Sequence, residues 1–161
     1  MCIVIDLNRI PSVLNPEASD HSEFKAILEW IDSRSARIVY GGKKYKSELV
    51  KMPRYLKVLS ERKKAGQVYE ADDGKIDEIE EQIKEKTQKT DFNDQAIVAI
   101  VIVSNSSFIC SCDKKAHAFF KLKSLYPKHV KRPIIYSNSK HKDLLYHRDV
   151  ISKCGPCCQS S

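Results

Sequence analysis

The feature that most constrains the fold is an apolar run near the middle of the chain, with acidic residues on both sides. The run, AIVAIVIV, covers residues 96–103, and Asp91 and Asp94 stand just before it. A second apolar segment, Phe108 to Cys112, follows and leads directly into Asp113. Buried segments that carry carboxylates at their ends are expected where an open α/β sheet builds its ligand site.

The run is compatible with two kinds of secondary structure. Its shortness and its β-branched residues favour a buried strand. The acids before it instead resemble a helix N-terminus, where the helix dipole favours carboxylates in the first turn. Asn105 is also suited to closing a helix of this length. We expect a helix from about Phe92 to about Ser104, followed by a buried strand from Phe108 to Cys112.

The remaining segments alternate between expected strands and helices. Further strands are expected at Ile3 to Ile5, Arg37 to Tyr40, Gln67 to Tyr69 and Pro133 to Tyr136, the last near a sheet edge because of its proline. Further helices are expected from Asp20, with Glu23 as a capping-box partner, from Tyr45 to Ala65 with a kink or break at Pro53, from Asp73 to Lys86, and from Lys114 to Leu125. This alternation predicts an α/β fold with a mostly parallel sheet covered on both faces.

Length and composition favour one cytoplasmic domain. A chain of 161 residues is most simply a single domain, which we place at residues 1–145. No tract approaches the roughly 20 apolar residues of a membrane span. The start, MCIVIDLNRIP, lacks the basic region and the longer apolar stretch of a signal peptide. We therefore expect a cytoplasmic protein whose six cysteines are free thiols.

The last residues, 146–161, hold a cysteine cluster, CGPCC. Cys154, Cys157 and Cys158 could bind zinc together with His147. One close cluster, however, lacks the second half of a typical structural zinc site. A flexible tail is the preferred interpretation.

The net charge of +7 is unevenly distributed. Residues 114–148 contain ten Lys and Arg residues and one acid, Asp143, and residues 43–64 are also basic, whereas residues 70–85 are mostly acidic. Basic surfaces attract polyanions through the release of counterions. Nucleic acid is therefore a natural partner.

Four acids are expected where strands end or helices begin: Asp6, Glu48, Asp94 and Asp113. In a parallel sheet the carboxyl ends of all strands lie along one edge, so these acids can converge although they are distant in sequence. Carboxylates without partners would repel one another, and a hard cation such as Mg²⁺ or Mn²⁺ makes their convergence favourable. Such an ion can activate water for attack on a phosphodiester.

Each acid also has a simpler structural interpretation. Asp6 could initiate a turn, and Glu48 could be an ordinary acid in the first turn of a helix. Asp91 and Asp94 could be helix caps, and Asp113 could cap the helix that follows it. Their joint placement at one sheet edge favours a shared role.

The same residues carry a resemblance to a known family. The chain resembles a PIN domain over about residues 1–140, through IDLN with Asp6 and Asn8, through Glu48 in GGKKYKSEL, through Asp94 in NDQAIVAIVIV, and through the strand that ends in Ser111-Cys112-Asp113. The acidic helix at residues 73–85 and the cysteine tail depart from the family pattern.

The resemblance implies a three-layer α/β/α fold and a Mg²⁺- or Mn²⁺-dependent endoribonuclease that acts on RNA rather than DNA. It implies the metal ligands Asp6, Glu48, Asp94 and Asp113, with Asp91 as an auxiliary acid. Asn8 and Ser111 would orient the ligands. Lys43, Lys44 and Lys114 are the basic residues nearest to the proposed edge and would bind the substrate.

Other functions stay open at this point. A catalytically silent PIN-like module would bind RNA or protein without metal. A receiver-like signalling domain would need adjacent acids after the first strand, which Asp6-Leu7-Asn8 does not supply.

The biological role and the partners also stay open, since a toxin, a defence ribonuclease and an RNA-processing enzyme would share these residues. An inhibitory partner protein fits an otherwise harmful ribonuclease. The sequence shows no clear dimer face, and a homodimer stays an open alternative.

Overall fold

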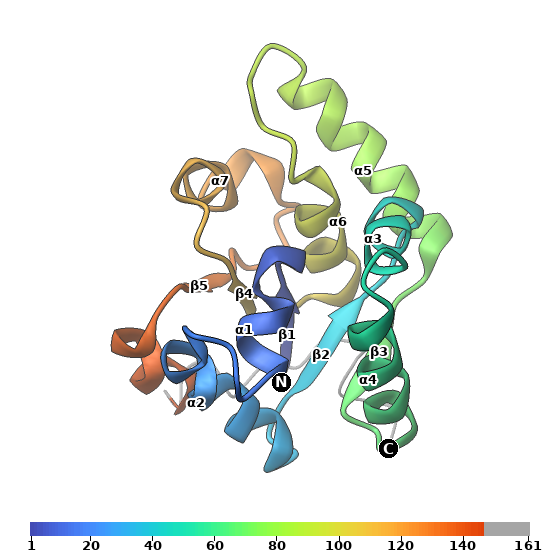
Figure 1. Ribbon diagram of the computed structural model, residues 1–161. Coiled ribbons are helices and arrows are strands. Elements are labelled where there is room, and N and C mark those ends of the chain that lie inside the picture. The colour runs from blue at the N-terminus through green and yellow to red at the C-terminus, as the bar shows by residue number, and fades with distance from the viewer. Residues whose placement is uncertain (147–161) are drawn as a thin grey trace.

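The computed structural model describes residues 1–146, and its centre is a five-stranded sheet in which all strands are parallel (Figure 1). The strand order is β3-β2-β1-β4-β5. This confirms the predicted α/β class, and the proline-preceded strand lies at an edge as expected. The strands are β1 (Cys2–Ile5), β2 (Arg37–Tyr40), β3 (Val68–Glu70), β4 (Phe108–Cys110) and β5 (Ile134–Tyr136).

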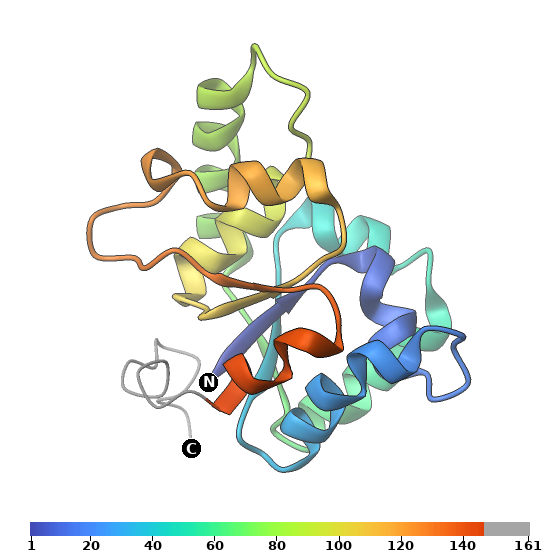
Figure 2. The ribbon, with the colours of Figure 1, turned by 90° about the vertical axis from the view of Figure 1, so that its left-hand side faces the viewer.

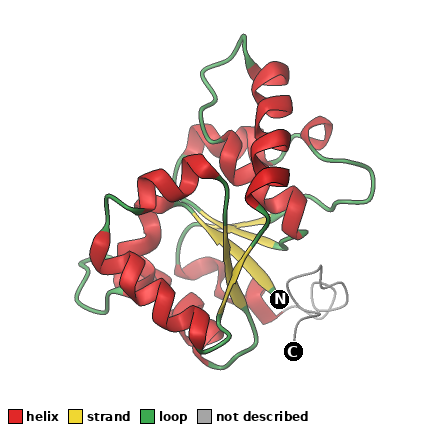
Figure 3. Cartoon of the chain, turned by 90° about the vertical axis from the view of Figure 1, so that its right-hand side faces the viewer, coloured by secondary structure: helices red, strands yellow, loops and turns green. Residues whose placement is uncertain are grey.

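Helices cover both faces of the sheet, which gives three layers (Figures 2 and 3). One face carries α1 (Ile10–Leu14), α2 (His21–Asp32), α4 (Pro53–Lys64) and the 3₁₀ helix η3 (Ser139–Tyr146). The other carries α5 (Asp73–Thr87), α6 (Gln95–Ser104) and α7 (Lys114–Phe120). Short connections complete the chain: the 3₁₀ helices η1 (Leu7–Arg9) and η2 (Lys123–Leu125), and α3 (Lys43–Leu49).

Helix α6 is the apolar run, and it packs on β1 and β2. Most of its residues are buried, because α5 covers it from the other side. The prediction of a helix is confirmed, although the helix begins at Gln95, after an N-cap at Asp94, rather than at Phe92. Asn105 closes it in the left-handed conformation, with φ of 53°. The following strand ends at Cys110, two residues earlier than predicted.

The register of the sheet brings distant residues to one edge. Ile5 at the end of β1 pairs with Cys110 at the end of β4, and Cys110 pairs with Tyr136 of β5. The ladder continues one residue further, since the Asp6 N–H donates to the Cys110 carbonyl over 2.9 Å. The Ser111 N–H likewise donates to the Tyr136 carbonyl over 3.1 Å. Asp6 and Ser111 are therefore neighbours at the carboxyl edge.

Three helix predictions need correction or refinement. The expected helix from Tyr45 to Ala65 is two helices, α3 and α4, that meet at Met52, because Pro53 takes the first position of α4. The last predicted helix ends at Phe120 and gives way to η2 instead of continuing to Leu125. The capping box is wrong: Asp20 accepts hydrogen bonds from Arg9 and Ser12 and makes no side-chain cap.

The cysteines also differ in part from expectation. Cys110 and Cys112 are free thiols, whereas Cys2 is disulfide-bonded, so the expectation of free thiols throughout is wrong at Cys2. The tail cluster at Cys154, Cys157 and Cys158, with His147, lies outside the described residues. No helix within residues 1–146 is long and apolar enough to cross a membrane.

Candidate carboxylate site

Asp6 is a buried carboxylate held at the carboxyl end of β1, with 7% of its surface exposed. Its Oδ1 accepts a hydrogen bond from the Asn8 N–H over 3.0 Å, and its Oδ2 accepts one from the Ser111 hydroxyl over 3.0 Å. Each oxygen keeps further lone-pair capacity after these bonds. Ser111, which we expected to orient the ligands, thus contacts Asp6 through its hydroxyl. Asn8 acts through its backbone, and its side chain is exposed.

Asp113 follows β4 and begins α7. Its Oδ1 accepts hydrogen bonds from the N–H groups of Lys115 at 2.8 Å and Ala116 at 3.2 Å, so it is a true N-cap. Its own N–H donates to the Ser111 hydroxyl oxygen over 3.2 Å. The buried Ser111 hydroxyl therefore links Asp6 and Asp113, which are far apart in sequence.

Asp94 occupies the N-cap position of α6 but does not cap the helix with its side chain. Burial, together with the negative charges of Asp6 and Asp113, raises the pKa of this carboxyl to about 6, and the positive charge of Lys44 partly opposes this rise. An acid at a helix N-cap position usually accepts a hydrogen bond from the first turn. Asp94 is half-buried, makes no such bond and has a strongly raised pKa. Such acids are candidates for functional sites.

A cavity of about 430 Å³ opens beside Asp6 and Asp94. Tyr45 lies in its wall, where its buried hydroxyl donates to the Ile5 carbonyl over 2.6 Å. The residues that line the cavity come from η1, α1, α3, the α3–α4 junction and the start of α6: Asp6, Leu7, Asn8, Pro11, Lys44, Tyr45, Glu48, Lys51, Met52, Asn93, Asp94, Ala96 and Ile97.

A second hollow of about 340 Å³ lies beside the first and includes Asp113. Asn93 and Asp94 line both spaces, so Asp94 stands between Asp6 on one side and Asp113 on the other. Phe92 and Phe119 stack against each other at 4.4 Å between ring centroids and form an apolar wall of the second hollow. The three aspartates thus share one region of the carboxyl edge.

The two weaker candidates take peripheral places. Glu48 lines the first cavity, but its carboxylate is half exposed and pairs with Lys51 at 2.8 Å. Glu48 therefore faces the site from α3 without direct contact to the aspartates. Asp91 is exposed and lines the second hollow beside Asp94 and Asp113.

The predicted basic residues separate into one central and two outer positions. The Lys44 ammonium reaches the first cavity, donates to the Asn93 carbonyl over 2.8 Å and lies 3.9 Å from Glu80. Lys43 instead pairs with Asp77 and is almost fully exposed. Lys114 is exposed at the start of α7, and its neighbour Lys115 lines the second hollow in its place.

Three residues of this region were missed by sequence reasoning. Tyr45 supports the main chain beneath Asp6, and Asn93 lines both hollows. Glu80 is a buried carboxylate on α5, with one oxygen that makes no hydrogen bond among the described residues although the Lys84 ammonium lies 3.1 Å away. The stripe of α5 could have revealed Glu80, since it lies four residues after Ile76 and three before Ile83 on the buried face.

The oxygen ligands of the site suit a hard cation, but the distances between its carboxylates are longer than direct coordination of one ion by all three would require. Asp6, Asp94 and Asp113 offer only oxygen ligands, and burial together with the charges of Asp6 and Asp113 raises the pKa of Asp94. Yet among residues 1–146 no three His, Cys, Asp or Glu side chains are grouped closely enough to hold one ion. Mg²⁺ is often held directly by one or two carboxylates and keeps several waters, so a looser arrangement is compatible with it.

Comparison of the chain with family models, with curated proteins and with solved structures finds no match. The fold therefore stands on the observed topology alone. It is an α/β fold in which helices flank a five-stranded, all-parallel sheet of order β3-β2-β1-β4-β5.

Proposed function

We propose that this protein is a PIN-like, divalent-metal-dependent endoribonuclease that hydrolyses RNA at the carboxyl edge of its sheet. The observation that carries the proposal is the state of Asp94. Its half-buried carboxylate caps no N–H group, and its pKa is raised to about 6 by burial and by two neighbouring aspartates. Burying Asp94 beside two other carboxylates costs the folded protein stability. A cation that binds at this position when the protein acts best explains why the arrangement is present.

Asp94, Asp6 and Asp113 would hold the ion, and Glu48 would face it from α3. A bound Mg²⁺ or Mn²⁺ supplies activation of water and neutralisation of charge on the phosphodiester. Ser111 fixes the orientation of Asp6 through its hydroxyl and of Asp113 through that residue's N–H. A fixed orientation lowers the cost of reaching a productive geometry.

Lys44 would serve the substrate rather than the ion. Its ammonium is held at the rim of the cavity by the Asn93 carbonyl, close enough for its positive charge to lower the pKa of Asp94. A fixed cation beside the carboxylates would attract a phosphate oxygen and stabilise the negative charge that develops during attack. Lys115 would do the same at the second hollow.

A second candidate function is a binding module of the same fold without catalysis. The loose spacing of the carboxylates among the described residues favours it. Such a module would bind RNA in a salt-dependent manner that is indifferent to metal and to the aspartates. Cleavage therefore separates the two functions.

The test is cleavage of a labelled single-stranded RNA with Mg²⁺ or Mn²⁺, compared with EDTA. Asp94→Asn and Asp113→Asn should each lose at least about 100-fold in rate, in line with the loss of a group that stabilises developing charge. Asp32→Asn is the matched control, because Asp32 is exposed at the end of α2, near the amino edge of the sheet. The wild type and the control should cleave alike. Equal rates in all four proteins would exclude the proposed site.

A further inference from the structure

The loop between α7 and β5 forms a second basic feature that the carboxylate site does not use. Figure 2 shows this loop (orange) standing away from the sheet, on the side opposite to the carboxyl end of β1. It surrounds a hollow of about 630 Å³. Five cations line this hollow together with apolar residues: Lys121, Lys123, Tyr126, Pro127, Lys128, Val130, Lys131, Arg132 and Pro133. We call this hollow and its rim the α7–β5 basic surface.

Within residues 1–146, the cations of this surface have no carboxylate partners. The ion pairs among residues 1–146 take their cations from residues 9–84, where carboxylates neutralise them. None of the five cations of the surface pairs with a carboxylate of the described residues, and residues 114–142 contain no Asp or Glu. Their charge is therefore available to an external anion.

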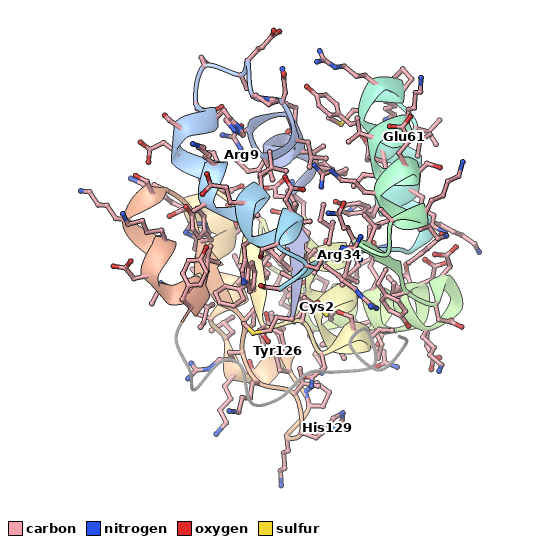
Figure 4. All side chains as sticks on the ribbon, turned by 90° about the horizontal axis from the view of Figure 1, so that it is seen from below. Cys2, Arg9, Arg34, Glu61, Tyr126 and His129 are labelled. Atoms are coloured by element: carbon pink, nitrogen blue, oxygen red, sulfur yellow. The ribbon has the colours of Figure 1, made fainter. Side chains whose placement is uncertain are left out.

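Hydrogen bonds to the main chain and buried side chains hold the loop that forms the hollow. The Arg132 guanidinium donates to the Lys121 carbonyl over 3.1 Å and so ties the end of the loop to the end of α7. Tyr126 is buried and donates to the Phe120 carbonyl over 3.0 Å, and Val130 is buried beside it. Figure 4 shows Tyr126 near the body of the protein and His129 at the outer end of the loop. A preformed surface loses little entropy on binding.

Helix α7 joins this surface to the carboxylate site. Asp113 caps its first turn and Lys121 its last, eight residues later, a separation of about 12 Å along the axis. Lys114 and Lys121 are seven residues apart and so lie on the same side of the helix. Both side chains are exposed. A row of positive charge therefore leads from Asp113 to the hollow.

We propose that the α7–β5 basic surface binds the phosphate backbone of single-stranded RNA. The same strand would extend along α7 to the carboxylate site, where it is cleaved. The identity of the strand as RNA rests on the proposed function. Five cations that pair with no carboxylate of the described residues surround a concave space, and this arrangement matches a flexible chain of phosphates, which can enter a hollow. A lipid surface is flat and would touch only the rim.

The experiment measures binding of a fluorescein-labelled single-stranded RNA of about 20 nucleotides, long enough to span a typical site. Fluorescence anisotropy is recorded with the full chain in EDTA, so that no cleavage is needed. Lys128→Ala/Lys131→Ala removes two cations of the surface. The matched control, Lys57→Ala/Lys64→Ala, removes two exposed lysines from α4, on the other face of the sheet.

The double substitution in the surface should weaken binding about 25-fold at 0.1 M salt and flatten the slope of log K against log salt by about 1.4, since each phosphate contact of a single strand contributes about 0.7. The control should stay within about twofold of the wild type. Equal losses in both proteins, no loss in either, or binding to phosphatidylserine vesicles in place of RNA would each overturn the proposal.

Failure of this proposal is distinguishable from failure of the proposed function. Metal-dependent cleavage by a protein whose binding ignores Lys128 and Lys131 would overturn only the α7–β5 basic surface. Absence of cleavage in a protein that shows the 25-fold loss would overturn only the nuclease activity and would support the surface.

Discussion

The raised pKa of Asp94 predicts that Asp94→Asn stabilises the protein at neutral pH. The folded state holds the proton up to a pKa of about 6, whereas the unfolded chain releases it near 3.8. The carboxylate therefore costs stability progressively as the pH rises through this interval, and the cost is complete above pH 6. At about 1.4 kcal/mol per pKa unit the cost would be about 3 kcal/mol, which solvent screening of this half-exposed group reduces to about 1–2 kcal/mol.

Urea unfolding measures this difference directly. At pH 7.5 the variant should be about 1–2 kcal/mol more stable than the wild type, and at pH 5 the gain should fall to about half. Asp91→Asn, the control, replaces an exposed acid three residues away and should change stability by less than about 0.5 kcal/mol. A gain that does not depend on pH, or a loss of stability at pH 7.5, would refute the explanation of the pKa.

The same variant provides a test of cation binding that does not depend on RNA. For an ion with Kd of about 1 mM, 10 mM Mg²⁺ should stabilise the wild type by about 1.4 kcal/mol. Asp94→Asn should lose most of this increment, because it removes the charge that the ion neutralises. An equal increment in both proteins would place any bound ion elsewhere.

Three further substitutions test the supports of the site by urea unfolding. Ser111→Ala should cost about 1–3 kcal/mol, because the buried Asp6 loses a donor, and a neutral result would contradict the linking role of this hydroxyl. Tyr45→Phe should cost about 1 kcal/mol through the lost bond to the Ile5 carbonyl, and a stabilised variant would contradict it. Gly42→Ala should cost about 2–3 kcal/mol, since φ is 80° and a Cβ would lie 2.5 Å from Ile76; unchanged stability would show that this turn relaxes freely.

Much of the fold followed from local pattern. The β-branched segments bounded by turns predicted the strands, and their alternation with helices predicted a parallel sheet. The apolar run at residues 96–103 is the instructive case. A β-branched strand and a buried helix look alike in such a run, and the acids before it together with Asn105 favoured the helix that α6 forms.

The limits of the sequence lay in element ends and in side-chain contacts. Pro53 predicted a kink or break in the helix, but only the structure shows that α3 ends at Leu49 and that α4 begins at Pro53. The capping box at Asp20 failed because Arg9 and Ser12, distant from the helix start, compete for its carboxylate. Tertiary partners of this kind are invisible to local reasoning.

The carboxylate site shows the same division. Parallel topology brought Asp6, Asp94 and Asp113 to one edge, as the placement of acids at element ends predicted. The link through Ser111 depends on register, and the pairing of Glu48 with Lys51 depends on rotamers. Neither can be derived from spacing alone.

The most direct test of the central claim is the position of a cation in crystals of the protein soaked in Mn²⁺. Anomalous difference density should show an ion between Asp94 and at least one of Asp6 and Asp113, about 2.0–2.3 Å from a carboxylate oxygen. The same density should be absent from Asp94→Asn. A fully soaked crystal with no ion at this edge, or with its ion elsewhere, would contradict the proposed site.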